Sequence, residues 1–171
     1  ITSLMPTRTG VALMVDVGAN VDCKPGQLLQ FAQMGSIYAE NVLRIHRPRV
    51  GLLNIGHEPT KGNSLSKEVY TLLQDAGVNF VGNIEGRDIS AGHCDVVVCD
   101  GFVGNVVLKF AEGLADALFG MMKEEFTSSI PAKLGALLLE PGLRSIKKKV
   151  DYTEYGGAPL LGLKKPIIKA H

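Results

Sequence analysis

The sequence contains few cysteines and no pattern that would pair them or bind a metal. Its three cysteines, Cys23, Cys94 and Cys99, are widely spaced, without a CxxC motif or a histidine-rich neighbourhood. An odd number of scattered cysteines argues against both a disulfide framework and a zinc site. This usage favours a reducing compartment, and we expect a cytoplasmic location.

Long apolar runs and a charge excess are also lacking. No stretch reaches the roughly 18 to 20 apolar residues that span a bilayer, and no charged segment followed by an apolar one opens the chain. We therefore expect neither a membrane-spanning helix nor a signal peptide. The 171 residues carry a formal net charge of +1 and are 46% hydrophobic, a balance typical of a globular domain that gives no reason to expect a nucleic-acid partner.

Three common catalytic fingerprints are absent. The segment GHEPTKG (Gly56–Gly62) places its lysine before the second glycine, whereas a P-loop needs GxxxxGK[ST]. No GxGxxG follows a strand-like run, and GxSxG does not occur. Binding of nucleoside triphosphates or dinucleotides and a nucleophile-elbow hydrolase therefore have no support.

Short β-branched runs alternate with helical patterns along most of the chain. The strand-like runs are Val11–Val17, Arg49–Gly56, Asn79–Gly82, Asp95–Asp100 and, at the end, Ile167–His171. The helix-like patterns are about Pro25–Leu43, Ser66–Ala76 and, after a glycine-bearing turn at Gly101–Gly104, Asn105–Glu125. This alternation predicts βαβ units and a single α/β domain, residues 1–171, with a mostly parallel sheet.

The segment Phe126–Val150 departs from this alternation. Pro131 and the pair Pro141–Gly142 divide it, which predicts a helical hairpin within residues 126–150. Its apolar residues are Ile130, Leu134, Leu137, Leu138 and Leu139, and its basic run is Arg144, Lys147, Lys148 and Lys149. Two interpretations are open: the leucines lie on a membrane surface with the cations at anionic headgroups, or they pack against a second subunit or the core. On general grounds the second is commoner.

Polar and glycine residues gather where the predicted strands end, which is where open α/β sheets bind ligands. They are Asp16, Gly18, Asn20 and Asp22; Asn54, Gly56, Glu58, Lys61, Gly62 and Asn63; Asn83, Glu85, Gly86, Arg87 and Asp88; and Asp100, Gly101, Gly104 and Asn105. Backbone amides exposed by glycine, together with Lys61 and Arg87 as cations, suit a bound phosphate. Ordinary turn residues are the competing interpretation, and a Mg²⁺ site on the acids is a weaker one.

Two other side chains have chemistry of their own. His57 can serve as a general base near phosphate, although a solvated loop histidine is the favoured interpretation. Cys99 can serve as an acyl acceptor, but it ends a strand that we expect to be buried, which favours an inert thiol.

Five stretches together resemble one protein family. They are VDVGANVDCKP (Val15–Pro25), RVGLLNIGHEPTKGN (Arg49–Asn63), FVGNIEGRD (Phe80–Asp88), DVVVCDGFVGNVVLK (Asp95–Lys109) and DYTEYGGAPLLG (Asp151–Gly162). They resemble the phosphate acyltransferase (PlsX) family of bacterial phospholipid synthesis, over essentially the whole chain. The resemblance implies a three-layer α/β/α fold related to phosphotransacetylases and isocitrate dehydrogenases. It also implies further segments at both ends, so we expect this chain to be a fragment.

The same resemblance implies an activity and its partners. The enzyme would take acyl-acyl carrier protein and orthophosphate, without a metal or other cofactor, and release acyl phosphate for a membrane-bound glycerol-3-phosphate acyltransferase. It implies a homodimer, loosely attached to the inner face of the cell membrane. This context reverses the preference for the hairpin, because an enzyme that passes a reactive product to a membrane protein gains from lying on the bilayer.

We accordingly predict two sets of site residues. The catalytic set is Lys61, Arg87, Asn54, Asn83, Asn105 and Asp100, and the substrate-binding set is Asp16, Gly18, Asn20, Gly56, Gly62, Glu85, Gly86 and Gly101. Three rival functions remain: a phosphotransacetylase-like enzyme using acyl-coenzyme A; a decarboxylating dehydrogenase with Asp16 and Asp100 as metal ligands; and a non-catalytic adaptor at the membrane surface.

Overall fold

The structure is a computed structural model that describes residues 1–150 and 157–169, apart from the side chains of residues 147, 149 and 150. Two sequence predictions extend outside the described residues. They are the first half of the last resembling stretch, residues 151–156, and the end of the last predicted strand, residues 170–171.

Five strands form the main sheet, in the spatial order β1-β2-β5-β3-β4. Four of them are parallel: β2 (Gly10–Val15), β3 (Arg49–Leu53), β4 (Asn79–Ile84) and β5 (Val96–Val98). The fifth, β1 (Thr2–Thr7), pairs antiparallel with β2 at the edge. The predicted mostly parallel sheet is therefore confirmed.

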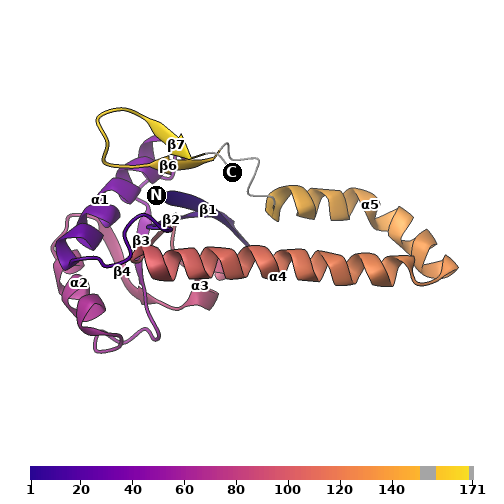
Figure 1. Cartoon of the computed structure of the whole chain (residues 1–171), viewed down its shortest axis with the longest axis horizontal. Coiled ribbons are helices and arrows are strands. Elements are labelled where there is room, and N and C mark those ends of the chain that lie inside the picture. The colour runs from indigo at the N-terminus through magenta and orange to yellow at the C-terminus, as the bar shows by residue number, and fades with distance from the viewer. Residues whose placement is uncertain (151–156, 170–171) are drawn as a thin grey trace.

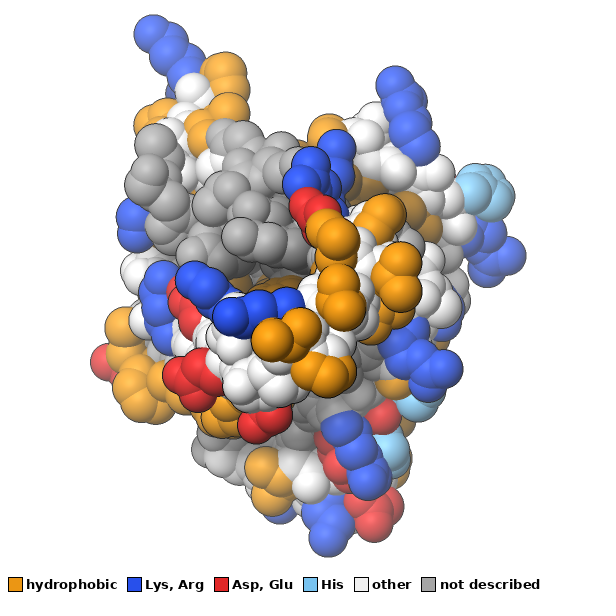
Figure 2. Space-filling model, turned by 90° about the vertical axis from the view of Figure 1, so that its right-hand side faces the viewer, with side chains coloured by type: hydrophobic (Ala, Val, Ile, Leu, Met, Phe, Trp, Pro, Cys, Tyr) orange, Lys and Arg blue, Asp and Glu red, His pale blue; other side chains and the backbone are white. Residues whose placement is uncertain are grey.

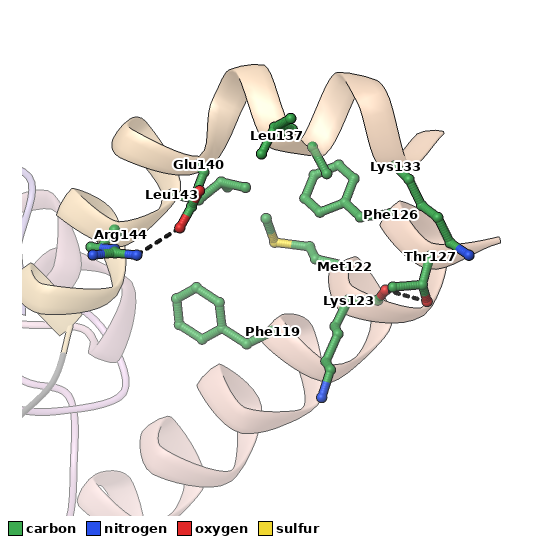
Figure 3. A pocket seen from close by; sticks show the side chains of 11 residues that line it. Phe119, Met122, Lys123, Phe126, Thr127, Lys133, Leu137, Glu140, Leu143 and Arg144 are labelled. Carbon is green, nitrogen blue, oxygen red and sulfur yellow. Dashed lines mark hydrogen bonds and ion pairs between the residues drawn. The ribbon is translucent and has the colours of Figure 1, made fainter. Parts of the chain in front are cut away.

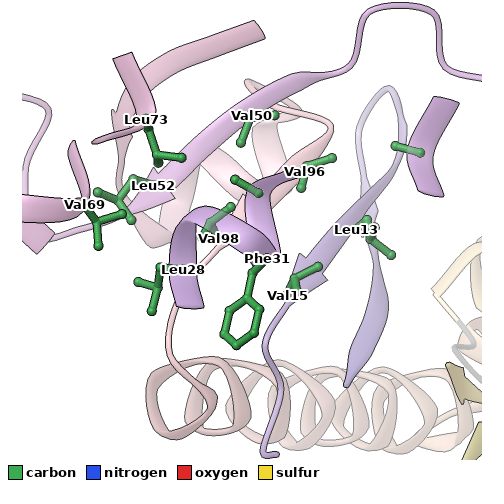
Figure 4. Packing of buried hydrophobic residues seen from close by; sticks show 12 residues of the cluster. Leu13, Val15, Leu28, Phe31, Val50, Leu52, Val69, Leu73, Val96 and Val98 are labelled. Carbon is green, nitrogen blue, oxygen red and sulfur yellow. The ribbon is translucent and has the colours of Figure 1, made fainter. Parts of the chain in front are cut away.

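Helices cover both faces of this sheet (Figure 1). The first face carries α1 (Pro25–Asn41) and α2 (Ser64–Gln74), whose side chains share one hydrophobic cluster with Val96 and Val98. Figure 4 shows Leu28 and Phe31 of α1 beside the strand residues of this cluster. The other face carries α3 (Gly86–Ala91) and the start of α4 (Gly101–Thr127), which share a second cluster with Val97. The three-layer architecture follows from this alternation of side chains along β5.

Two elements of the body were not predicted. Strand β1 contains Pro6, which has no backbone N–H to donate to a neighbouring strand and therefore argues against a strand in the sequence. The structure tolerates Pro6 because β1 is an edge strand. Helix α3 has only six residues, GRDISA, too few to show helical periodicity. The strands themselves begin or end up to three residues from the predicted bounds, a usual error at element ends.

The prediction of a turn at Gly101–Gly104 is wrong, because α4 begins at Gly101. These glycines serve close packing instead. A Cβ on Gly101 would lie 2.7 Å from the backbone oxygen of Asn20, and a Cβ on Gly104 would overlap the backbone oxygen of Asp16. The loop after β2 therefore sits directly on the first turn of α4.

The predicted hairpin within residues 126–150 is also wrong in its bounds. Helix α4 continues to Thr127, and a single helix, α5 (Ile130–Val150), follows after two residues and contains Pro141. Pro131 lies in the first turn of α5, where proline is well tolerated. Figure 1 shows α4 running well beyond the sheet and α5 returning alongside it. We call the second half of α4 (residues 114–127) together with α5 the helical arm.

The helical arm exposes many apolar side chains. On α4 these are Phe110, just before the arm, and Leu114, Leu118 and Met121, and on α5 they are Ile130, Leu134, Leu137, Leu138, Leu139 and Ile146. Figure 2 shows hydrophobic side chains gathered at the end of the molecule where the arm faces the viewer. None of the helices within the described residues combines the length and apolarity that crossing a bilayer requires.

The last two strands form a separate antiparallel pair, β6 (Ala158–Leu160) and β7 (Ile167–Lys169). The predicted final strand thus exists but does not join the main sheet. The pair is attached to the body through Thr2, whose Oγ1 donates a hydrogen bond to the Pro159 oxygen at 3.1 Å.

Two glycines of α4 allow a matched test of this packing. We expect Gly104→Ala to lower the free energy of unfolding by about 1–3 kcal/mol, because the added methyl group overpacks the contact with Asp16. Gly113→Ala in the same helix meets no neighbouring atom and should raise stability by about 0.5–1 kcal/mol through backbone entropy. Urea unfolding of both variants checks the pair; equal effects would contradict the role given to Gly104.

Candidate functional site

The parallel strands end together at one edge of the sheet. Val98 pairs with Val15 on one side and with Leu52 on the other, and Leu53 pairs with Ile84. The predicted catalytic and substrate-binding residues lie in the loops and helix starts that follow these positions, except Asn83, which is the last residue but one of β4. They therefore share one edge, which we call the strand-end edge.

The loop after β2 is organised by the buried carboxylate of Asp16. Its Oδ2 accepts hydrogen bonds from the backbone N–H (2.7 Å) and side-chain Nδ2 (3.0 Å) of Asn20. Its Oδ1 accepts from the Ile1 amino group at 2.8 Å and from the Ala19 N–H at 3.3 Å. Burial by itself raises the pKa of Asp16, but the hydrogen bonds from Ile1 and Asn20 outweigh it and hold the pKa below its ordinary value.

The start of α4 completes this half of the edge. Asp100 is the N-cap residue, and its Oδ1 accepts from the Val103 N–H at 2.8 Å. A Cβ on Gly18 would lie 3.5 Å from the Asn105 side chain. The structure thus brings together six predicted residues: Asp16, Gly18, Asn20, Asp100, Gly101 and Asn105.

The loop after β3, residues 54–63, carries the predicted cation Lys61, and we call it the Lys61 loop. Asn54 Nδ2 donates to the Lys61 backbone oxygen at 3.1 Å, which closes the loop on itself. Gly62 has φ +91°, and a Cβ there would overlap Asn54 Oδ1 and the Ser66 hydroxyl. Glycine is therefore required at position 62 by both its backbone conformation and its surroundings.

Asn83, near the end of β4, attaches this loop to the sheet. Its Nδ2 donates to the Glu58 backbone oxygen at 2.8 Å, and this bond fixes the orientation of the amide. Asn83 is buried. Among the buried side-chain nitrogen and oxygen atoms in the described part of the chain, its Oδ1 is the only one without a hydrogen-bond partner.

The two predicted cations differ in their surroundings. Arg87 is exposed in the first turn of α3, and its Nε donates to Glu85 Oε2 at 2.9 Å. Within the described residues, no hydrogen bond or ion pair reaches the ammonium group of Lys61. Lys61 therefore offers its full charge to a ligand, whereas Arg87 shares its charge with Glu85.

A hydrogen-bonded cluster whose contacts we did not predict joins the Lys61 loop to α3. Asp88 is 4% exposed; its Oδ2 accepts from His57 Nε2 at 2.6 Å, and its Oδ1 accepts from His93 Nδ1 at 3.0 Å. The hydrogen bond to Asp88 raises the pKa of His57. The interpretation of His57 as a solvated loop side chain is thus wrong in one respect: the ring is half-exposed but anchored.

The sequence carried one signal for Asp88. Glu85 and Asp88 are the N-cap and N3 residues of α3, and Asp88 Oδ2 also accepts from the Glu85 N–H at 2.8 Å. Two such polar residues three positions apart are typical of a helix start. Nothing in the sequence indicated the pairing of Asp88 with His57, which is 31 residues away.

Two of the three cysteines, Cys94 and Cys99, are buried, and Cys23 is partly exposed. Cys99 is 3% exposed at the end of β5, and burial raises the pKa of its thiol well above the ordinary range. Burial likewise raises the pKa of Cys94 to about 12. A thiol in that state is a poor nucleophile at neutral pH, which agrees with the interpretation of Cys99 as inert.

The acids at the edge are committed to the protein. Asp16 is fully bonded, and Asp100 caps α4. No group of three or more His, Cys, Asp or Glu side chains is arranged to hold a metal ion in the part of the chain that the structure describes. The donor arrangement therefore gives the dehydrogenase alternative no support.

A second hollow surface lies between the two helices of the arm, with a volume of about 630 Å³. Figure 3 shows Phe119, Met122 and Leu143 pointing into it, while Lys123 and Lys133 point outward. Phe119 is 18 residues beyond Gly101, about 27 Å along α4 at 1.5 Å per residue. This groove is therefore separate from the strand-end edge.

Comparison with known proteins places this architecture in a family. The model of the family described as "Fatty acid synthesis protein" matches residues 1–171. A "Phosphate acyltransferase" from Brevibacillus brevis is 62% identical over 168 residues, which cover 98% of this chain and 50% of that protein. Another from Bacillus cereus strain AH820 is 61% identical, covering 98% of this chain and 51% of that protein. The chain spans about half the length of the curated relatives it matches.

A solved structure agrees on the fold. The EutD phosphotransacetylase from Staphylococcus aureus superimposes with a TM-score of 0.53 at 15% sequence identity, covering 67% of this chain and 42% of that one. The predicted relationship to the phosphotransacetylase fold is confirmed.

Proposed function

We propose that this chain, which belongs to the family described as fatty acid synthesis proteins, is part of an enzyme that transfers a fatty acyl group from a thioester to inorganic phosphate. The product is acyl phosphate for phospholipid synthesis. Relatives named phosphate acyltransferase support the proposal. Because the chain covers about half of those relatives, the proposal concerns the whole protein.

One observation carries the proposal. The Lys61 loop is fixed to the end of β4 and to α3, so that the ammonium group of Lys61, which has no hydrogen bond or ion pair among the described residues, is held on the same edge of the sheet as Arg87. Anions bind where backbone N–H groups and cations converge at such edges. A phosphate dianion carries the charge that such an edge attracts.

The reaction needs a phosphate oxygen placed against the thioester carbonyl. Attack forms the new C–O bond and a tetrahedral oxyanion, and collapse of that oxyanion breaks the C–S bond and releases the carrier thiol. In our proposal Lys61 and Arg87 bind the phosphate charge, and backbone N–H groups near Gly56 and Gly101 stabilise the oxyanion. Asn105 contacts substrate from the start of α4.

The remaining predicted residues act by holding these groups in place. Asn54 and Asn83 fix the Lys61 loop through backbone oxygens, and Asp16 fixes the loop after β2. Asp100 caps α4, and Glu85 orients the Arg87 side chain. Gly62 lies where a side chain would overlap Asn54 and Ser66. Gly86 begins α3, and a Cβ there would meet no neighbouring atom.

Lys61→Ala in the whole protein should raise the KM for phosphate about tenfold or more, because a hydrogen bond to a charged group contributes about 1.5–3 kcal/mol. Arg87→Ala should act in the same direction but less, since Glu85 already neutralises part of its charge. Steady-state acyl phosphate formation against phosphate concentration measures both. Lys67→Ala, an exposed lysine of α2, is the control. Unchanged phosphate affinity and turnover in both variants would remove these cations from the site.

The acyl donor in our proposal is acyl-acyl carrier protein, and acyl-coenzyme A is the alternative. The same acyl chain presented on each carrier separates them. A higher kcat/KM with acyl-acyl carrier protein supports the proposal, and a preference for acyl-coenzyme A makes the protein a phosphotransacetylase-like enzyme.

We further propose that the helical arm rests on the inner face of the cell membrane, in a homodimeric cytoplasmic enzyme, near the acyltransferase that uses its product. The exposed fractions of Ile130 and Leu138, 76% and 83%, support this placement. Apolar side chains beside lysines are typical of helices that lie in a membrane interface. Arg144 forms an ion pair with Glu140 at 2.6 Å, so it contributes less charge to such a contact than the basic run suggests.

Leu138→Glu should weaken binding of the whole protein to anionic phospholipid vesicles several-fold, because a carboxylate replaces an inserted apolar group. Soluble activity should stay close to wild type. Ile37→Glu, which replaces a 61% exposed apolar residue of α1 outside the arm, is the matched control. Sedimentation with vesicles gives the result, and unchanged sedimentation of Leu138→Glu would refute the contact. Size-exclusion chromatography of the same variant distinguishes a lost dimer from lost membrane binding.

A further inference from the structure

Asp88 makes more contacts than a helix cap needs. The hydrogen bond from the Glu85 N–H to Oδ2 already completes the N-terminal cap of α3. The same oxygen also accepts from His57, and the second oxygen accepts from His93. A buried carboxylate that accepts three hydrogen bonds has a well-defined position and orientation.

His57 connects the Asp88 carboxylate to the Lys61 loop. It lies four residues before Lys61, and its 2.6 Å bond to Asp88 joins the loop to the helix that carries Arg87. A second side-chain link, the hydrogen bond from Asn83 to the Glu58 backbone oxygen, joins the loop to the end of β4. The two links lie on adjacent residues of the loop, and together they set its distance from α3.

We propose that Asp88 and His57 are a positioning pair that holds the Lys61 loop against α3 and so sets the affinity of the strand-end edge for phosphate. The inference rests on the proposed function, since it names residues that position the phosphate-binding cation. Neither residue belongs to the predicted site. Asp88 reaches the ligand only through His57 and the loop, because its carboxylate is buried and already bonded.

The pair is sensitive to pH in a defined direction. The hydrogen bond to Asp88 raises the pKa of His57, Glu85 adds to this, and Arg87 opposes it. Burial raises the pKa of Asp88, but its hydrogen bonds from Glu85 and His57 outweigh this and lower it. The ion pair is therefore fully formed below the ordinary histidine pKa of about 6.5 and is lost as pH rises through the raised pKa of His57. At the acid end it is lost as pH falls through the lowered pKa of Asp88.

Neutral His57 still donates a hydrogen bond to Asp88, so the loop is weakened rather than released at high pH. Asp88 also faces His93, which has to be considered in any titration of the cluster. The ionisation of phosphate itself changes with pH and affects every variant equally, so the informative quantity is the ratio of a variant's KM to that of wild type.

The test uses the whole protein and four variants: His57→Gln, His57→Ala, Asp88→Asn and, as a control, His46→Gln. Glutamine keeps a donor for Asp88 but does not titrate, and His46 is an exposed histidine of the loop after α1. The KM for phosphate and kcat are measured from well below to well above pH 6.5, and phosphate binding is measured by calorimetry.

We expect His57→Ala and Asp88→Asn to raise the KM for phosphate about tenfold at low pH, with kcat changed less than twofold. The ratio of KM for His57→Gln to that of wild type should fall towards one as pH rises, and His46→Gln should match wild type throughout. Histidine NMR should show the pKa of His57 falling towards its ordinary value in Asp88→Asn. Far-ultraviolet circular dichroism confirms that each variant is folded.

Wild-type KM in folded His57→Ala, or a constant KM ratio for His57→Gln across pH, would overturn the positioning pair. A wild-type protein that binds phosphate but forms no acyl phosphate would overturn the proposed function alone, because the calorimetric affinities of the variants still test the pair. If Asp88→Asn does not fold, His57→Ala and His57→Gln decide the question, since the His57 side chain is 55% exposed.

Discussion

Three consecutive valines produce the arrangement on which the rest of the molecule depends. Strand β5 consists only of Val96–Val98, yet it pairs with β2 on one side and with β3 on the other. All three side chains are fully buried, two against α1 and α2 and one against the layer of α3 and α4. Because this short strand aligns its neighbours, loops that are far apart in sequence leave the sheet at one edge. The loop after β2, which we call the Asp16 loop, the Lys61 loop and the start of α4 share that edge because of this alignment.

Much of the body was predictable because its elements follow local rules. Within a few residues, the local sequence indicates the type of the valine strand, of the apolar strand at residues 10–15 and of the helix after Pro25. The failures have different causes. Strand β1 was missed because Pro6 lies within it. Proline is tolerated there because β1 is an edge strand, and that position depends on the tertiary structure. Gly101 and Gly104 read as a turn, although their lack of a Cβ serves the contact with Asp16 and Asn20. Pro141 reads as a break, yet it lies within α5.

The candidate site was predictable in its location but not in its internal connections. The rule that ligands bind beyond parallel strand ends selected loops that the structure brings to one edge of the sheet. It could not show that Arg87 pairs with Glu85, or that the carboxylate of Asp16 is fully bonded. The pairing of Asp88 with His57 was not predicted, because each residue has an ordinary local explanation, as a turn residue and as a loop histidine. Their 2.6 Å contact arises only when β3 and β4 lie side by side.

The helical arm and the strand-end edge share a single helix. The first turn of α4 packs so closely on the Asp16 loop that no added methyl group fits, whereas its second half carries exposed apolar side chains. A ligand or surface bound to the arm can change the edge only by favouring one of two positions of α4. The contact between Gly104 and Asp16 leaves little room for a second position. A partner or surface that covers the arm should therefore leave the loops at the strand-end edge where the sheet holds them.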